Sequence, residues 1–273
     1  MSLAVSEGIH TTAMIGPEVD LAPDVIVGPY SILEGPIRIG SGTVIESHAC
    51  LSGPLVMGRN NLVGHGAVLG KSPQSRAYQG EATTLEIGDG NTFREYVTVH
   101  RGTVDGGGVT RVGDGNLLMI NAHVGHDAQI GDNCTLVNCA LVAGHSKLSD
   151  GCILSGHSAI QQRVRVGRLA MLGGMGASSK DIPPFVLQQG YNCVTGLNTI
   201  GLRRAGMTHE TIDALRQAFR ILYKEGRAQT AALDRIETDF GAFPEVLEFT
   251  EFIRASCLGI NPARDADRKS WNF

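Results

Sequence analysis

Residues 116–145 read NLLMINAHVGHDAQIGDNCTLVNCALVAGH, and an aliphatic residue recurs at every sixth position from Leu118 to Val142. A period of six fits neither an amphipathic helix nor a simple alternating strand. It fits a short strand followed by a corner, repeated so that each unit stacks on its neighbours. This stretch therefore predicts a repetitive β-solenoid.

The same spacing extends to both sides of this stretch. Aliphatic or large apolar residues open hexads at Ile9, Ile15, Leu21, Val27, Leu33, Ile39, Ile45, Leu51, Met57, Val63, Leu69, Ile87, Phe93, Val99, Val112, Leu118, Val124, Ile130, Leu136, Val142, Leu148, Leu154, Ile160, Val166 and Leu172. The fifth position is mostly small or β-branched, which suits a crowded corner. We expect a parallel β-helix in which the first-position side chains point inward and stacked coils hydrogen-bond at a spacing of about 4.8 Å.

Composition agrees with a thin repetitive core and excludes some partners. The chain has 273 residues, of which 36 are glycine and only 5% are aromatic. A net charge of −4 gives no general attraction to nucleic acid. The six scattered cysteines suit small buried positions in a reducing compartment. We find no signal peptide or membrane span and expect a cytoplasmic protein.

Two insertions interrupt the hexads, at residues 71–86 and 103–111. Insertions into a solenoid project as loops on one face, and that face often binds ligands. A tolerated surface bulge is the alternative for each. After Leu172 the period fades, and Thr208 is a plausible N-cap for the first of several amphipathic helices. We expect a β-helix domain over residues 1–186 and a helical domain over residues 187–273, with residues 191–204 as a connecting loop.

The central histidines are polar residues that the repeat does not require. Val124, Val142 and Ile160 are 18 residues apart, so three hexads per coil would stack them on one side of successive coils. The polar residues expected on that side are His126, His145, Gln161 and Gln162, with His123 just before the corner. Several polar groups that converge on one place indicate a functional site more strongly than a single histidine does.

Such a cluster suits proton abstraction. A neutral imidazole at His126 can accept a proton from a sugar hydroxyl near neutral pH. Asp127 could orient that ring, although adjacent residues of a strand point to opposite faces. Gly144 offers an unobstructed N–H for a developing oxyanion. A zinc site is the rival interpretation, and we rank it below general base catalysis.

Several sequence blocks together resemble the UDP-N-acetylglucosamine O-acyltransferases, which catalyse the first acyl transfer of lipid A biosynthesis. These blocks are VTVHRGT (97–103), GGG (106–108), NLLMINAHVGHD (116–127), LVAGH (141–145) and DIPPFVLQQG (181–190). The resemblance covers nearly the whole chain. It implies a left-handed β-helix, a homotrimer with its sites between adjacent subunits, an acyl carrier protein as donor, and chemistry that requires neither a cofactor nor a metal.

The resemblance also implies roles for individual residues. His126 would be the general base, supported by Asp127, and the Gly144 amide would stabilise the thioester oxyanion. Residues matching acceptor-binding or acyl-binding positions are Gln74, His123, His145 and Gln162, those on the nucleotide side are Asn198 and Arg204, and Gly174 matches the position that limits acyl length. The chain departs from the family pattern at Ser75, Ala77, Gln161, Ile200 and Ala205.

These departures leave the acceptor open. The main alternatives are an acyltransferase acting on a 3-amino sugar nucleotide, an acetyl-coenzyme A dependent enzyme, and a noncatalytic binding protein. Arg163, Arg165 and Arg168 form a basic cluster that could attract the acidic carrier protein or could be an ordinary solvated face.

Overall fold

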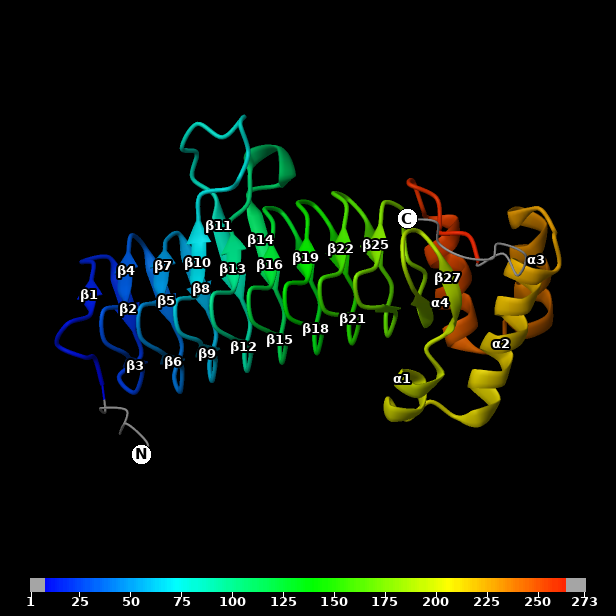
Figure 1. The fold of residues 1–273 in the computed structure, drawn as a ribbon, viewed down its shortest axis with the longest axis horizontal. Helices are drawn as coiled ribbons and strands as arrows, with labels where there is room; N and C mark the ends of the chain where they lie inside the picture. The colour runs from blue at the N-terminus through cyan, green and yellow to red at the C-terminus, as the bar shows by residue number, and fades with distance from the viewer. Residues whose placement is uncertain (1–7, 264–273) are drawn as a thin grey trace.

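From Ile15 onward each hexad forms one short strand, and three hexads complete one coil of a prism (Figure 1). The computed structural model describes residues 8–263. The expected left-handed parallel β-helix with C-terminal helices is confirmed. The first seven and last ten residues of the two expected domains lie outside the described residues, and the division between residues 186 and 187 stays a prediction.

Three sheets form the sides of the prism. The first sheet contains β1 (Met14–Ile15), β4 (Ile32–Glu34), β7 (Cys50–Ser52), β10 (Val68–Lys71), β13 (Thr98–His100), β16 (His123–Val124), β19 (Leu141–Val142), β22 (Ala159–Ile160) and β25 (Ala177–Ser178). The second contains β2 (Val19–Leu21), β5 (Ile37–Ile39), β8 (Leu55–Met57), β11 (Thr84–Ile87), β14 (Val109–Val112), β17 (Gln129–Ile130), β20 (Lys147–Leu148) and β23 (Arg165–Val166). The third contains β3 (Ile26–Val27), β6 (Val44–Ile45), β9 (Leu62–Val63), β12 (Thr92–Phe93), β15 (Leu117–Leu118), β18 (Thr135–Leu136), β21 (Ile153–Leu154), β24 (Met171–Leu172), β26 (Val186–Gln188) and β27 (Val194–Leu197).

The first-position side chains fill the prism, as the hexads predict. From Val27 to Leu172 they are buried. Ile9, at the start of the described chain, has 51% of its surface exposed. Burying these side chains removes apolar surface from water, which is the main favourable contribution to folding.

A ladder of buried asparagines stabilises the corner between the second and third sheets. Asn91 donates its backbone N–H and its side-chain amide to the Asn61 side-chain oxygen, at 2.8 and 3.0 Å. Asn116 repeats this pattern on Asn91, at 2.9 and 3.0 Å, and the Cys134 N–H bonds to the Asn116 oxygen at 2.7 Å. Each amide thus satisfies backbone groups that the sheets leave unpaired at the corner.

The two insertions leave the prism at one corner, between the first and second sheets (Figure 1). Residues 72–83 connect β10 to β11, and residues 101–108 connect β13 to β14. The second insertion includes a 3-10 turn, η1 (Val104–Gly106). The prediction that both project on one face is therefore confirmed.

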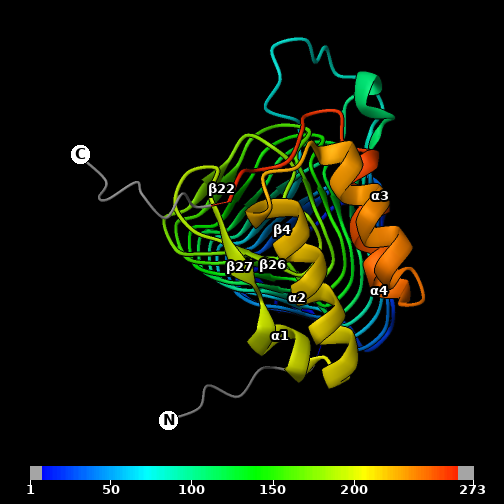
Figure 2. The same cartoon turned by 90° about the vertical axis from the view of Figure 1, so that its right-hand side faces the viewer.

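The C-terminal helices cover the end of the prism (Figure 2). They are α1 (Thr199–Arg204), α2 (His209–Lys224), α3 (Gln229–Phe240) and α4 (Pro244–Arg254). The Thr208 side chain caps α2 by accepting from the Thr211 N–H, as predicted. The prediction of a connecting loop over residues 191–204 is wrong in part, because β27 pairs antiparallel with β26 and Asn198 caps α1.

Two arginines of the predicted basic cluster attach α4 to the prism. Arg165 bonds to the Asp181 carboxylate at 2.9 Å and lies over the Phe252 ring, and Arg168 pairs with Glu248 at 2.6 Å. Only Arg163 of the cluster is exposed. Arg165 and Arg168 are therefore engaged in ion pairs with the prism and α4, and the attraction of the cluster to a carrier protein stays a prediction. None of the helices between residues 8 and 263 has the length and apolar character of a membrane-spanning segment.

We predict that Asn91→Ala lowers the free energy of unfolding by about 2–4 kcal/mol, because it leaves the buried N–H and side-chain amide of Asn116 without their acceptor. Urea unfolding at fixed protein concentration measures this. Asn60→Gly is the control: Asn60 is exposed and has a φ of 56°, which glycine adopts readily, so its stability should stay close to that of the parent. Equal effects of the two substitutions would contradict the ladder's role.

Candidate active site

The central histidines lie at the corner from which the two insertions leave the prism. Val124 of β16 is in register with Val142 of β19, so Gly144 lies one coil above His126, and His145 lies above Asp127. The His145 N–H donates to the His126 carbonyl at 2.9 Å across these coils. Two residues that are 19 positions apart thereby become neighbours.

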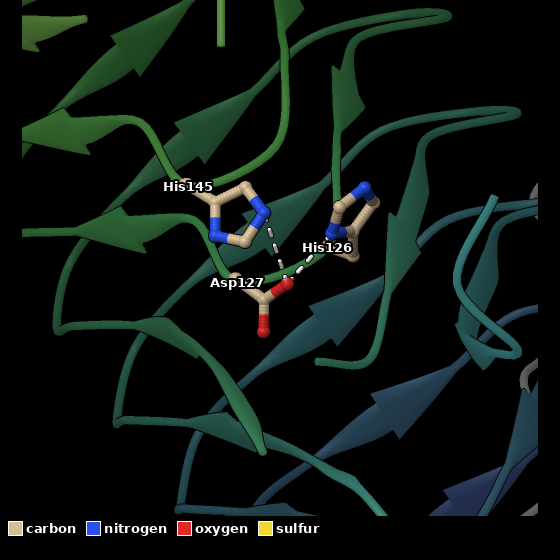
Figure 3. A group of neighbouring side chains, drawn as sticks. All are labelled: His126, Asp127 and His145. Carbon is tan, nitrogen blue, oxygen red and sulfur yellow. Dashed lines mark hydrogen bonds and ion pairs between the residues drawn. The ribbon is translucent and has the colours of Figure 1, made fainter. Parts of the chain in front are cut away.

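Asp127 turns toward His126 because it occupies the corner and not a strand. Its φ is 63°, in the left-handed region that aspartate tolerates better than most residues. The His126 Nδ1 and the Asp127 Oδ2 are 2.6 Å apart (Figure 3). This bond leaves Nε2 as the ring nitrogen that can take a proton from a ligand. The expected support of His126 by Asp127 therefore has the required geometry.

His145 faces the same carboxylate from the next coil. Its Nε2 is 3.7 Å from the Asp127 Oδ2, and its ring lies edge-on to that of His126, with centroids 5.0 Å apart. Burial lowers the pKa of His145, and the nearby Asp127 opposes that shift. Arg163 and His126 lower this pKa further. The neutral ring of His145 is therefore favoured at neutral pH.

Gly144 makes room for the His126 ring. A Cβ atom on Gly144 would lie 2.8 Å from Cε1 and 2.9 Å from Nε2 of His126, closer than side chains approach one another. The Gly144 N–H meets no acceptor among residues 8–263. A free N–H therefore lies beside the nitrogen that would act as base, as an oxyanion site requires.

His123 and His100 extend the cluster along the first sheet. Their ring centroids are 5.5 Å apart, and the Thr98 hydroxyl is 2.7 Å from the His123 Nδ1. Burial, with contributions from His100 and His126, lowers the pKa of His123 to about 4. His123 is therefore neutral at physiological pH. We did not select His100 from the sequence, although it directly follows a first-position valine in the VTVHRGT block.

The His126, Asp127 and His145 ligand atoms lie within 4.8 Å of one another, a spacing that could also hold a metal ion. Both Asp127 oxygens already accept hydrogen bonds, however. Thr103 donates to each of them at 2.7 Å, and His126 contacts Oδ2. Metal binding would have to displace these donors, so the geometry suits an acid–base pair better than a metal site.

The other predicted residues are spread along the prism. Gln161 and Gln162 are exposed one coil beyond His145, Gln74 is exposed in the first insertion, and Gly174 and Arg204 are exposed toward the C-terminal end. A Cβ atom on Gly174 would meet only the Gly156 carbonyl, at 3.6 Å, so there is space at this position, and its role in limiting acyl length stays a prediction. The stacking register places Gln162 above Gly144 at the same corner, whereas no contact of His126 with Gln74, Gly174 or Arg204 is found among residues 8–263.

Asn198 has a structural partner at each end of its amide. Its oxygen accepts from the Gly201 N–H at 3.1 Å as the N-cap of α1, and its Nδ2 donates to the Leu169 carbonyl at 2.9 Å. Its predicted contact with a nucleotide stays a prediction. Ser75, at a departure from the family pattern, accepts a bond from the Ala77 N–H at 3.3 Å and belongs to the turn of its loop.

Two protein families match parts of the chain. The family described as UDP-N-acetylglucosamine O-acyltransferase, domain 2, matches residues 181–261, where the helices lie. The bacterial transferase hexapeptide family, a set of six repeats, matches residues 110–144, which include His126 and Asp127.

Solved structures of acyltransferases match over nearly the whole chain. The UDP-N-acetylglucosamine acyltransferase of Bacteroides fragilis is 38% identical, with a TM-score of 0.89 over 92% of this chain and 98% of that one. The UDP-N-acetylglucosamine O-acyltransferase of Moraxella catarrhalis is 37% identical, with a TM-score of 0.88 over 93% and 99%. The UDP-N-acetylglucosamine acyltransferase of Campylobacter jejuni is 32% identical, with a TM-score of 0.88 over 94% and 100%.

We predict that His123 makes the fold less stable in acid. The pKa of His123 rises from about 4 in the folded chain to about 6.5 on unfolding, so between these values the unfolded chain binds a proton that the folded chain does not. Stability should fall as the pH drops from 6.5 to 4, and His123→Asn should lose less stability over this range. Urea unfolding at a series of pH values measures the difference.

The control for this prediction is His157→Asn, because His157 is exposed at a different corner of the prism. Its pH dependence should match that of the parent protein. The same loss of stability in His123→Asn as in the parent would contradict the prediction.

Proposed function

The chain belongs to the UDP-N-acetylglucosamine O-acyltransferase family, and from this membership we propose its reaction. It transfers a 3-hydroxyacyl chain from acyl carrier protein to the glucosamine 3-hydroxyl of UDP-N-acetylglucosamine, the first step of lipid A biosynthesis. The observation that carries this proposal is the His126–Asp127 pair, with the free Gly144 N–H beside it.

In this reaction the Nε2 of His126 removes the proton from the acceptor hydroxyl. The oxygen attacks the thioester carbonyl, and the Gly144 N–H donates to the oxyanion that forms. When the tetrahedral intermediate collapses, the carbon–sulfur bond breaks and the imidazolium returns its proton to the departing sulfur. Asp127 stabilises the imidazolium between these two steps.

The neutral histidines beside the base suit an uncharged sugar. His123 lies on the first sheet and His145 at the corner, and the pKa values of both are lowered by burial. A neutral ring can donate a hydrogen bond to a sugar hydroxyl or accept one from it. Because it carries no charge, it does not compete with the His126 imidazolium for the Asp127 carboxylate. We assign these two residues to acceptor binding.

We further propose a homotrimer in which the outer face of the first sheet is buried. Met14, Ile32 and Leu141 expose 64%, 38% and 47% of their surfaces on this face in the isolated chain. An exposed apolar face of this kind is typical of an interface between subunits. Association would bring residues from neighbouring chains to the His126 corner, which supports a role for residues that do not converge within one chain.

The donor and the location follow from the same proposal. We propose acyl carrier protein as the donor, with Arg163 as the residue of the predicted cluster that remains exposed to an acidic partner. All six cysteines are free thiols, which supports a reducing compartment such as the cytoplasm.

Because the chain departs from the family pattern at several positions, the identity of the acceptor sugar should be tested directly. Ile200 exposes 64% of its surface on α1, where the resemblance implies an acidic residue on the nucleotide side. Offering UDP-N-acetylglucosamine and its 3-amino analogue in parallel identifies the acceptor. A product from the amino sugar alone would replace the O-acyl assignment with N-acyl transfer.

We predict that His126→Ala lowers kcat about 1,000-fold, because the acceptor hydroxyl loses its general base. Product formation is measured by mass spectrometry with acyl carrier proteins loaded with 3-hydroxyacyl chains of several lengths. His157→Ala, at an exposed histidine on another corner, should keep the parent rate. Undiminished turnover by His126→Ala would rule out this role for His126.

Gly144→Ala should lower kcat roughly 100-fold, because its Cβ atom would displace the His126 ring from its position beside the N–H. Steady-state rates with saturating donor and acceptor measure the change. Gly196→Ala is the matched control, since a Cβ atom there meets nothing within 4 Å. A Gly144→Ala enzyme with the kcat of the parent would show that the His126 ring does not need this space.

A further inference from the structure

The second insertion contacts the catalytic carboxylate directly. The Thr103 backbone N–H donates to the Asp127 Oδ1, and the Thr103 hydroxyl donates to Oδ2, both at 2.7 Å. One residue therefore binds both oxygens of a carboxylate whose side chain is only 1% exposed. Charge-assisted bonds of this length are among the stronger hydrogen bonds in proteins.

The insertion holds Asp127 at both of its ends. Thr110 is buried on β14, where the insertion rejoins the prism, and its hydroxyl accepts from the Asp127 N–H at 2.7 Å. Thr103, at the other end, binds the side chain. Asp127 is therefore fixed through its backbone and through its carboxylate by the same segment.

Gly106 closes the turn over the carboxylate. Its N–H donates to the Thr103 hydroxyl at 3.2 Å, and a Cβ atom on Gly106 would lie 2.0 to 2.4 Å from the carboxylate atoms of Asp127. Gly106 is not among the residues with positive φ, so the backbone conformation does not account for this glycine. The close approach of the carboxylate does.

Two histidines compete for one oxygen of this carboxylate. The Asp127 Oδ2 is 2.6 Å from the His126 Nδ1 and 3.7 Å from the His145 Nε2. A modest rotation of the Asp127 side chain would exchange these partners. Thr103 opposes such a rotation, since it bonds to both oxygens at once.

We propose that Thr103 is a positioning residue, and that it selects His126 over His145 as the histidine that Asp127 supports. The proposal rests on the proposed function for its catalytic consequence. Thr103 keeps the Asp127 Oδ2 on the His126 Nδ1, which keeps the His126 Nε2 directed at the acceptor. The second insertion then serves catalysis without touching the substrate.

Other charged and titratable groups surround this pair and bear on its pH dependence. Asp105 lies in the same turn and acts on His145, as does Arg163 from the next coil, and His123 lies close to His126. A substitution at position 103 changes none of these side chains, although removal of the Thr103 hydroxyl also removes the cap on the Gly106 N–H in the turn that holds Asp105. The comparison of Thr103→Val with Thr103→Ser therefore tests the hydroxyl and both of its hydrogen bonds.

The test compares Thr103→Val, Thr103→Ser and Val104→Ala. Valine keeps the shape and the backbone N–H but removes the hydroxyl, serine restores the hydroxyl, and Val104 is an exposed neighbour in the same turn. We expect Thr103→Val to lower kcat roughly tenfold with little change in the acceptor KM, because a hydrogen bond to a charged group is lost. Thr103→Ser and Val104→Ala should stay near the parent rate.

A second readout does not depend on turnover. Nuclear magnetic resonance of histidine-labelled protein detects the His126 Nδ1 proton, which the short bond to Asp127 shifts downfield. This resonance should move upfield or exchange away in Thr103→Val and should persist in Thr103→Ser. A parent-like kcat and an unchanged resonance in Thr103→Val would overturn the proposal, as would a Thr103→Ser variant as impaired as Thr103→Val.

These outcomes separate the two proposals. If the parent protein forms no acylated product but Thr103→Val loses the resonance, the positioning role stands and the proposed reaction fails. If the parent protein is active and Thr103→Val behaves like it in both readouts, only the positioning role fails.

Discussion

The stacking register of the coils is the constraint on which the site depends. In the central region, parallel pairing places residues 18 positions apart directly above one another, as Val124 and Val142 show. That register places Gly144 above His126 and His145 above Asp127. A slip of one residue would turn inward side chains outward and would also separate His126 and Asp127 from the glycine that accommodates the His126 ring.

Polar ladders reinforce this register where a hydrophobic core cannot. First-position aliphatic side chains pack together but tolerate small shifts, whereas the amides of Asn61, Asn91 and Asn116 bond only in one alignment. The corners also require unusual backbone angles, such as the φ of 63° at Asp127. The hydrogen bonds that Asp127 accepts from Thr103 and donates to Thr110 offset the cost of that conformation at the residue where orientation matters most.

The sequence predicts the prism well because its period is a direct consequence of coil geometry. It also predicts that His126 and His145 meet, since their spacing follows from three hexads per coil. The orientation of Asp127 could not be predicted, because alternation along a strand does not apply at a left-handed corner. The contact of Thr103 with Asp127 joins an insertion to a coil, and no periodic pattern encodes such a contact.

In the helical region, too, the sequence predicts only part of the structure. Apolar spacing and Thr208 indicate α2, but β27 and α1 depend on pairing with β26 and on the Asn198 cap. Arg165 and Arg168 look like a free basic cluster in the sequence, because no local pattern indicates their partners, Asp181 and Glu248, which are 16 and 80 residues away. Tertiary contacts of this kind determine whether a charged residue is available to a partner.

The most direct test of this account is a crystal structure of the protein with UDP-N-acetylglucosamine bound. The account predicts the glucosamine 3-hydroxyl within about 3 Å of the His126 Nε2, with the Gly144 N–H facing the side from which the thioester approaches. A sugar bound elsewhere on the prism, or a metal ion held by His126, Asp127 and His145, would contradict it.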